Sequence, residues 1–330
     1  LVGRLPSEVQ SVAVCFLNSY ANRSHEAEAA RRITALRPDL FVTVSSELSP
    51  EIREYERFST AIVNAYVQPL VRPYLERFAQ RLRGEGVTAA PNIVLSNGGL
   101  TVIEDAARYP VRMVESGPSA GVMAAAWFGR GLSDRDVLAF DMGGTTAKAS
   151  FLEGSTPSIT RNFEVARSYR FKPGSGIPLN VTTVDLIEIG AGGGSIARVD
   201  SLGRLKVGPD SAGAEPGPAC YGRGGTLPTV TDSDLLLGYL DAATFLGGAM
   251  PLDTDAASRA FQSEIGARLG LDAVQAAWAV HRLVNEGMAN AIRIHAAERG
   301  KSVDSCAMVP FGGAAGLHAC HVAELLGIRR

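Results

Sequence analysis

The segment Asp141-Met142-Gly143-Gly144-Thr145-Thr146-Ala147-Lys148 decides the fold that we predict for this chain. The apolar run Val137-Leu138-Ala139-Phe140 precedes it, and Ala149-Ser150-Phe151-Leu152 follows it. Both flanks are typical of strands, so we predict a β-hairpin with the glycine pair at its tip. An ordinary two-residue hairpin turn needs only Asn-Gly or Asp-Gly, without two threonines and a lysine behind it.

The residue types at this tip are those that bind phosphate. Gly143 and Gly144 let backbone N–H groups approach phosphate oxygens, and the hydroxyls of Thr145 and Thr146 add donors. Asp141, at the strand end, can bind hydrated Mg²⁺ or orient a water molecule. The alternative is a tight hairpin turn with a solvated aspartate. The candidate catalytic residues are Asp141, Thr145, Thr146 and Lys148, with Asp141 also the candidate metal ligand.

A second glycine-rich segment lies near the end of the sequence. Phe311-Gly312-Gly313-Ala314-Ala315-Gly316 follows the apolar run Met308-Val309-Pro310 and precedes a helix ending near Leu326. Such a turn would bring bare backbone against a nucleotide base or ribose, with the helix N-terminus facing the ligand. Tight packing of strand on helix is the alternative. Neither G-x-G-x-x-G nor G-x-x-x-x-G-K-[ST] occurs, which disfavours Rossmann and P-loop enzymes.

Composition and charge exclude several classes of protein. The 330 residues are 46% hydrophobic and 20% charged, as in ordinary globular domains. With 32 Lys and Arg against 34 Asp and Glu, the chain lacks the basic field of a nucleic-acid binder. No apolar run is long enough to span a bilayer, and the cysteines show no disulfide spacing. We therefore predict a cytoplasmic protein with neither nucleic acid nor membrane as partner.

The order of segments indicates an α/β protein. Val12-Ala13-Val14 and the helix predicted from Ser24 to near Pro38 form a strand-helix unit. Ser49 and Pro50 begin a long amphipathic stretch that Pro69 and Pro73 should divide into two helices. Its apolar residues are Ile52, Tyr55, Ile62, Tyr66, Leu70, Tyr74 and Phe78. Residues 167–231 are predicted to be rich in loops and partly β, and two helices follow from about Asp253 and from Asp272 to Arg299.

Three further groups of residues are weaker candidates. His318 and His321 have a spacing that can bind metal, but no third ligand is near them in the sequence. Cys220 is better explained as a packed thiol than as a nucleophile, since no histidine base is apparent. Asp185 and Glu188 could act as a carboxylate pair, although on a strand their spacing would place them on opposite faces.

The segments together resemble the hydantoinase A/5-oxoprolinase family of the actin-like, ribonuclease H-like ATPase superfamily. The matching segments run in the family's order along nearly the whole chain: Ser45-Ser46-Glu47, Glu51 to Arg57, Ser96-Asn97-Gly98-Gly99, Glu115-Ser116-Gly117-Pro118, Asp141 to Lys148, Gly190 to Ala197, Val207-Gly208-Pro209, Pro216 to Tyr221, Thr229 to Asp232, and Phe311 to His318. Some members carry a histidine just before the Gly190 segment, where this chain has Asp185 to Ile189.

The resemblance implies an enzyme that uses ATP and Mg²⁺ to hydrolyse a small cyclic amide such as a hydantoin, 5-oxoproline or a related lactam. Gly143 and Gly144 would hold the phosphates, and Gly312, Gly313 and Gly316 would shape the adenosine pocket. The segment of Gly192, Gly193, Gly194 and Ser195, with Asp185 and Glu188, would bind the substrate, the loop acting as an anion cradle of backbone donors. A ketone carboxylase subunit and a nucleotide-switched module without catalysis are the alternatives.

The resemblance also implies an organisation and partners. Residues 1–45 would end the family's N-terminal domain, and 46–330 would form the hydantoinase A/oxoprolinase domain, with a loop-rich β insertion at 165–232. Family members have an earlier Asp-x-Gly-Gly-Thr loop that this sequence lacks, so we expect a chain truncated at both ends. The expected partner is a hydantoinase B-type subunit or domain, in an oligomer.

Overall fold

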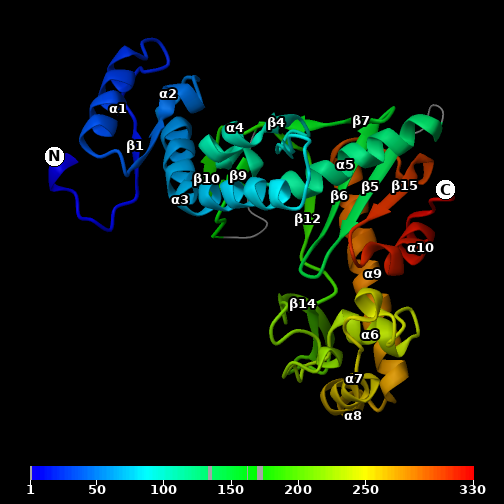
Figure 1. Cartoon of the computed structure of the whole chain (residues 1–330). Coiled ribbons are helices and arrows are strands. Elements are labelled where there is room, and N and C mark those ends of the chain that lie inside the picture. Colours follow the sequence, from blue (N-terminus) through cyan, green and yellow to red (C-terminus); the bar gives the residue numbers. More distant parts are fainter. Residues whose placement is uncertain (1, 133–135, 162, 169–173) are drawn as a thin grey trace. The chain divides into compact units, whose positions relative to one another are not determined.

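The computed structural model describes residues 2–132, 136–161, 163–168 and 174–330 (Figure 1). They form two compact units, and the chain passes between them more than once. Unit 1 comprises residues 1–120 and 159–184, and unit 2 comprises residues 121–158 and 185–330. These compact units are not the family's domains, whose boundary at residues 45 and 46 stays a prediction. The predicted α/β class is confirmed, since both units combine helices with strands.

Unit 1 begins with the predicted strand-helix unit, in which two parallel strands flank the first helix. Its elements are β1 (Ser11–Val14), α1 (Ser24–Leu36), β2 (Phe41–Val44), α2 (Ser45–Leu48), α3 (Glu54–Gly84), β3 (Asn92–Val94), β4 (Leu100–Val102), α4 (Ile103–Arg108), the start of α5 (Ser116–Gly129), β8 (Ile159–Thr160), β9 (Phe163–Val165), β10 (Ile177–Leu179) and β11 (Thr183–Val184). The late strands complete its core, because Leu179 and Val181 pack with Leu48, Ala61 and Val111.

Helix α3 is continuous through both prolines, so the prediction of two helical pieces is wrong. A proline removes only one backbone donor, and tertiary contacts hold α3 on either side of the pair. Before them, the Gln68 side chain donates to the Arg108 carbonyl over 3.1 Å. After them, Leu75 packs against Ile103 and Ala106 of α4. These contacts favour a single helix over a break.

The large apolar side chains of α3 face outward, which reverses the expected orientation of the helix. We call Tyr55, Ile62, Tyr66, Leu70 and Tyr74 the α3 stripe; they are 57 to 84% exposed. The opposite, more polar face is buried because its groups find partners inside the unit. There Asn64 donates to Thr43, and Arg57 donates to the backbone carbonyls of Glu51 and Phe16, among other contacts.

A buried carboxylate joins α1 to the strand ends of unit 1. Glu26 is fully buried, and its Oε1 accepts hydrogen bonds from the Phe16 N–H (2.6 Å) and the Ser45 hydroxyl (2.7 Å). Its Oε2 accepts one from the Ser46 N–H (2.8 Å). Burial opposes ionisation, but these bonds outweigh it and hold the pKa of Glu26 below its ordinary value.

Unit 2 is built on a mixed sheet in which the strands run in the order β12-β6-β5-β15. β15 pairs with β5 in parallel, and the predicted hairpin is the antiparallel pair β5 and β6. The elements are β5 (Val137–Met142), β6 (Ala147–Glu153), β7 (Thr156–Pro157), β12 (Ile187–Ile189), β13 (Ser195–Val199), β14 (Leu205–Ser211), α6 (Val230–Leu236), α7 (Thr254–Phe261), α8 (Ala267–Leu269), α9 (Ala273–Glu298), β15 (Ala307–Phe311) and α10 (Ala315–Leu326).

The core of unit 2 lies between this sheet and α9. Phe140, Met142 and Phe151 of the hairpin belong to one buried cluster with Met288 and Ile292 of α9. The predicted helix starts are confirmed, because Asp253 and Asp272 accept hydrogen bonds from the first turns of α7 and α9. Helices α6 and α10 each contact α9, beside which both lie in Figure 1, and the site depends on this arrangement.

In its described part, the region predicted to be rich in loops consists of short strands and one 3-10 helix, Ala219–Tyr221, between irregular segments. Some of its residues, 169–173, lie outside the described part. Among the described residues, no helix is both long and apolar enough to cross a membrane.

We predict that Glu26→Gln lowers the free energy of unfolding at neutral pH by about 1–3 kcal/mol, because the amide keeps one uncharged acceptor oxygen and puts an NH₂ group against a donor that the carboxylate accepted from. Since the folded state depresses this pKa, the carboxylate's contribution is present above the ordinary value of 4.5 and is lost as pH falls through the lowered pKa. Urea unfolding of both proteins at several pH values should show the difference shrinking below about pH 4.5. An unchanged difference in acid would contradict this role.

Candidate functional site

The predicted phosphate loop is the tip of the β5–β6 hairpin. The strands pair up to Met142 opposite Ala147, and the Gly143 N–H donates to the Thr146 carbonyl over 3.0 Å to close the turn. Gly144 and Thr145 are exposed, whereas Asp141 and Thr146 are half-buried. The tip therefore presents a glycine and a threonine to solvent, on a base held by the sheet.

Charged residues form one row across the sheet behind this tip. In the strand registers Glu188 lies opposite Lys148, Lys148 opposite Asp141, and Asp141 opposite Phe311. Directly opposed residues point to the same face of a sheet. Three of the residues predicted for the site, Asp141, Lys148 and Glu188, are thus brought together from three strands.

The segment expected to be a substrate cradle instead packs on the phosphate loop through its backbone. The Gly193 N–H donates to the Gly143 carbonyl (3.0 Å), and the Gly194 N–H donates to the Gly144 carbonyl (2.6 Å). The Gly192 N–H donates to the hydroxyl of buried Ser195 (2.9 Å). An anion cradle built from these three N–H groups would require them to give up these partners.

Gly192 has no room for a side chain. A Cβ there would lie 2.6 Å and 2.7 Å from the Thr145 C and N atoms and 2.8 Å from the Gly144 carbonyl carbon. At Gly144 itself, a Cβ would meet no protein atom within 4 Å. Its φ is outside the left-handed range, so backbone strain does not require a glycine at Gly144.

Helix α6 holds the Gly192 segment from the other side. The N–H and hydroxyl of Thr231 both donate to the Gly193 carbonyl, over 2.7 Å and 2.9 Å. The first turn of α6 is fixed by a capping box between Thr229 and Asp232. The buried carboxylate of Asp232 also accepts from the N–H groups of Ala219 and Cys220. This network sets where the first turn of α6 lies.

The second glycine loop meets the first at the same end of the sheet. Gly312 has a φ of 91°, and a Cβ there would lie 2.4 Å from Asp141 Oδ1. The Ala314 N–H donates to the Met142 carbonyl over 2.9 Å. Gly313 and Gly316 have open space where a side chain would be. The loops at Gly143, Gly192 and Gly312 therefore converge beside Asp141.

Asp185 is engaged elsewhere. Its carboxylate accepts hydrogen bonds from Arg299, one of them 2.8 Å from Nε, and Arg299 also contacts His295 Nδ1 over 2.9 Å. Burial and the adjacent Arg299 charge lower the pKa of His295. Glu188 is exposed within the charged row. The two expected carboxylates therefore have different surroundings.

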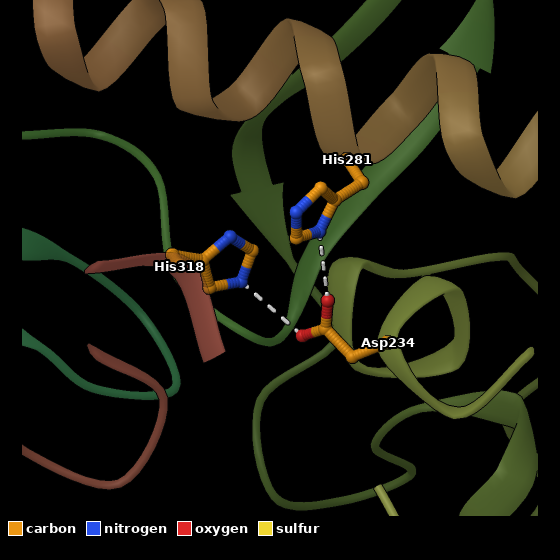
Figure 2. A group of neighbouring side chains, drawn as sticks. All are labelled: Asp234, His281 and His318. Carbon is orange, nitrogen blue, oxygen red and sulfur yellow. Dashed lines mark hydrogen bonds and ion pairs between the residues drawn. The ribbon is translucent and has the colours of Figure 1, made fainter. Parts of the chain in front are cut away.

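Sequence reasoning missed two members of a buried group. Asp234 of α6 lies 3.1 Å from His281 Nδ1 and 3.2 Å from His318 Nε2 (Figure 2). His321 lies outside this group, with Nδ1 3.0 Å from Asn285 Nδ2. Burial disfavours a charged Asp234, but hydrogen bonds with both histidines hold its pKa below the ordinary value. His281 precedes Val284 and Met288 on the buried face of α9, a periodicity that could have revealed it.

Burial raises the pKa of the Cys220 thiol, and neighbouring Asp232 raises it further, which suits a packed thiol. Burial likewise raises the pKa of Cys306 to about 11. Cys15 is half-buried and Cys320 exposed; all four cysteines are free.

The comparisons with known proteins agree with these motifs. A family model described as hydantoinase/oxoprolinase matches residues 57–330. The chain belongs to the hydantoinase/oxoprolinase family. The resemblance inferred from the sequence is therefore confirmed.

Relatives within the hydantoinase/oxoprolinase family match nearly the whole chain. A Methanocaldococcus jannaschii protein is 42% identical over 97% of this chain and 47% of its own length. Caprolactamase subunit alpha of Pseudomonas jessenii is 39% identical over 97% of the chain and 45% of its own. A nucleotide-free structure of acetone carboxylase is 26% identical, with a TM-score of 0.82, over 97% of this chain and 44% of that one. The chain spans about half the length of the curated relatives it matches.

We predict that Gly192→Ala lowers the free energy of unfolding by about 1–3 kcal/mol, because its methyl group would overlap the backbone of the phosphate loop. Gly144→Ala is the matched control and should leave stability nearly unchanged, since its methyl meets no protein atom. Urea unfolding of the two variants provides the comparison. Equal stabilities would mean that the Gly192 segment does not pack on the hairpin tip as described.

Proposed function

We propose that the protein containing this chain uses ATP to open a small cyclic amide, with unit 2 supplying part of the nucleotide site. The observation that carries the proposal is the convergence of three glycine-rich loops beside Asp141 at one end of one sheet. Caprolactamase, a relative at 39% identity, supports a lactam as the class of substrate.

The hairpin tip fits a phosphate chain and a magnesium ion. Gly144 and Thr145 are exposed, and the space beside Gly144 can admit an anion close to its backbone. Thr145 and Thr146 offer hydroxyl donors, and Lys148 offers a positive charge next to Asp141 in the row. A carboxylate at this position suits a hard cation, so Asp141 would hold Mg²⁺.

The adenosine would lie along the Gly312 loop. Gly312 brings backbone directly against Asp141, and Gly313 and Gly316 leave room for a ring or ribose to approach. Ala314 ties this loop to Met142. The proposed adenosine and phosphate subsites are therefore braced against one another by the protein's own hydrogen bonds.

The chemistry explains why ATP would be needed. Water attacks a delocalised amide carbonyl slowly, and a bound ATP supplies the phosphoryl group that converts the amide oxygen into a better leaving group. Residues of the charged row would orient the reacting groups, and Glu188, exposed beside Lys148, is our candidate for substrate contact. We assign Asp185 a positioning role through Arg299. The Gly192 to Ser195 segment would keep the phosphate loop in place.

A second function, as part of a ketone carboxylase, is favoured by the match to acetone carboxylase at a TM-score of 0.82. Both readings share the nucleotide site and differ in the acceptor of the phosphoryl group. A nucleotide-switched module without catalysis is the third reading. It would show no ATP turnover that depends on a small substrate.

We also propose a partner of the hydantoinase B type within an oligomer. Relatives are named as subunits of larger enzymes, among them caprolactamase subunit alpha and acetone carboxylase beta subunit. The exposed α3 stripe supports an association, because monomers rarely leave so many large apolar side chains in water on one helix. The cytoplasmic location stays a prediction.

The deciding experiment measures ADP release by the full-length protein, with and without its B-type partner. Lactams, hydantoins, 5-oxoproline and ketones are added one at a time. ADP formed in proportion to an opened cyclic amide supports the main proposal. Turnover with ketones and bicarbonate alone supports the carboxylase, and absence of substrate-dependent turnover contradicts both.

We predict that Asp141→Asn leaves the fold intact and lowers ATP turnover at least about 100-fold, because the amide cannot replace a carboxylate at the metal. Circular dichroism and urea unfolding check the fold, and coupled ADP detection checks the turnover. Full activity in the variant, or its unfolding, would show that the metal ligand lies elsewhere.

We predict that Gly144→Ala weakens ATP binding by about tenfold or more, that is, by ~1.4 kcal/mol, although its stability is unchanged. The methyl would occupy space that the protein leaves free and the phosphates need. Isothermal titration of ATP into variant and wild type is the measurement. Wild-type affinity in a stable Gly144→Ala protein would exclude the tip as a phosphate loop.

A further inference from the structure

The buried group of Asp234, His281 and His318 lies outside the proposed nucleotide chemistry. The three side chains come from α6, α9 and α10, and each is at most 1% exposed. Figure 2 shows both imidazoles turned toward the same carboxylate, one at each oxygen. One ligand atom from each residue lies within 4.8 Å of the other two.

Asn285 determines which His318 nitrogen bears a proton. The amide Nδ2 of Asn285 faces His321 Nδ1 at 3.0 Å, and its Oδ1 faces His318 Nδ1 at 2.8 Å. In this orientation of the amide its oxygen accepts, and the facing His318 Nδ1 donates. In a neutral imidazole this leaves a bare lone pair on Nε2, which points at Asp234 Oδ2 from 3.2 Å. With the amide in this orientation the two lone pairs would repel at that distance, and a positive centre between them removes the repulsion.

That positive centre is either a proton or a metal ion. A proton would make His318 an imidazolium, with its ring centroid 4.7 Å from that of His281. In that case the single carboxylate of Asp234 can balance only one charged histidine in this buried place. A divalent cation satisfies both imidazoles and the carboxylate together without protonating either ring.

We propose that Asp234, His281 and His318 bind a divalent transition-metal ion of the zinc type. Two imidazole nitrogens and a carboxylate are ligands that Zn²⁺ prefers. The two imidazole nitrogens lie 3.1 Å and 3.2 Å from different oxygens of Asp234, so one ion would need a small shift of these side chains toward the spacing of about 3.3 Å between ligands of a tetrahedral zinc. The hydrogen bond from His318 Nδ1 to Asn285 is the outer contact that orients metal-binding histidines in proteins.

Such an ion would connect the two helices, α6 and α10, that adjoin the Gly192 segment and the Gly312 loop. Asp234 lies one turn after Thr231, which holds the Gly193 carbonyl, and His318 lies in the first turn of α10, directly after the Gly312 loop. The metal would therefore be a structural ion that fixes α6 and α10 on α9. It would not touch the nucleotide.

The test uses the full-length protein, stripped with a chelator and reloaded with Zn²⁺ or with Co²⁺ as a spectroscopic substitute. Wild type should hold about one equivalent more metal than Asp234→Asn or His318→Gln, and its Co²⁺ difference spectrum against these variants should show tetrahedral bands. Loading should raise its thermal midpoint. His321→Gln, on the same helix but outside the group, is the matched control and should keep the ion.

A second measurement covers variants that fail to fold. Crystals of the wild-type protein grown with Zn²⁺ should give an anomalous peak among the three side chains. No peak there, or equal metal content in wild type and folded Asp234→Asn, would overturn the proposal in favour of a hydrogen-bonded Asp234, His281 and His318 group without metal. Absence of substrate-dependent ATP turnover in the metal-loaded wild-type protein would instead count against the proposed function. The two failures are therefore distinguishable.

Discussion

The candidate site depends on backbone hydrogen bonds between two glycine segments. The N–H groups of Gly193 and Gly194 donate to the carbonyls of Gly143 and Gly144, and this contact needs the backbones so close that Gly192 can carry no side chain. Thr231 extends the contact into α6. The hairpin tip is consequently not a free turn. Its exposed groups are held in place by these hydrogen bonds, and the phosphate site that we propose would require such preorganisation.

Local features of unit 2 could be predicted because they depend on short-range chemistry. Strand flanks and a glycine pair identified the hairpin from Val137 to Leu152, and capping aspartates identified the starts of α7 and α9. The contact between the Gly192 and Gly143 segments could not be predicted in this way. It joins backbone groups about fifty positions apart, and no side-chain pattern records a pairing of that kind.

The errors in unit 1 and at the histidines have a related cause. Periodicity indicated that α3 has an apolar face, but burial was decided by partners on distant elements that satisfy Arg57, Asn64 and Gln68. The spacing of His318 and His321 on α10 indicated a pair of metal ligands. The fold instead brings His318, without His321, next to Asp234 and His281 on two other helices. Residue spacing within one helix does not reveal side-chain contacts between different helices.

The division of the chain has a consequence for synthesis on the ribosome. Residues 1–120 belong to unit 1, yet Leu179 and Val181 complete its core and Asn180 donates its N–H to the Thr60 hydroxyl over 2.8 Å. The hairpin of unit 2 is translated in between. Residues 1–120 therefore cannot complete their core until residues 159–184 have been synthesised. A nascent chain with such an interval is a natural client for a chaperone that shields apolar surface.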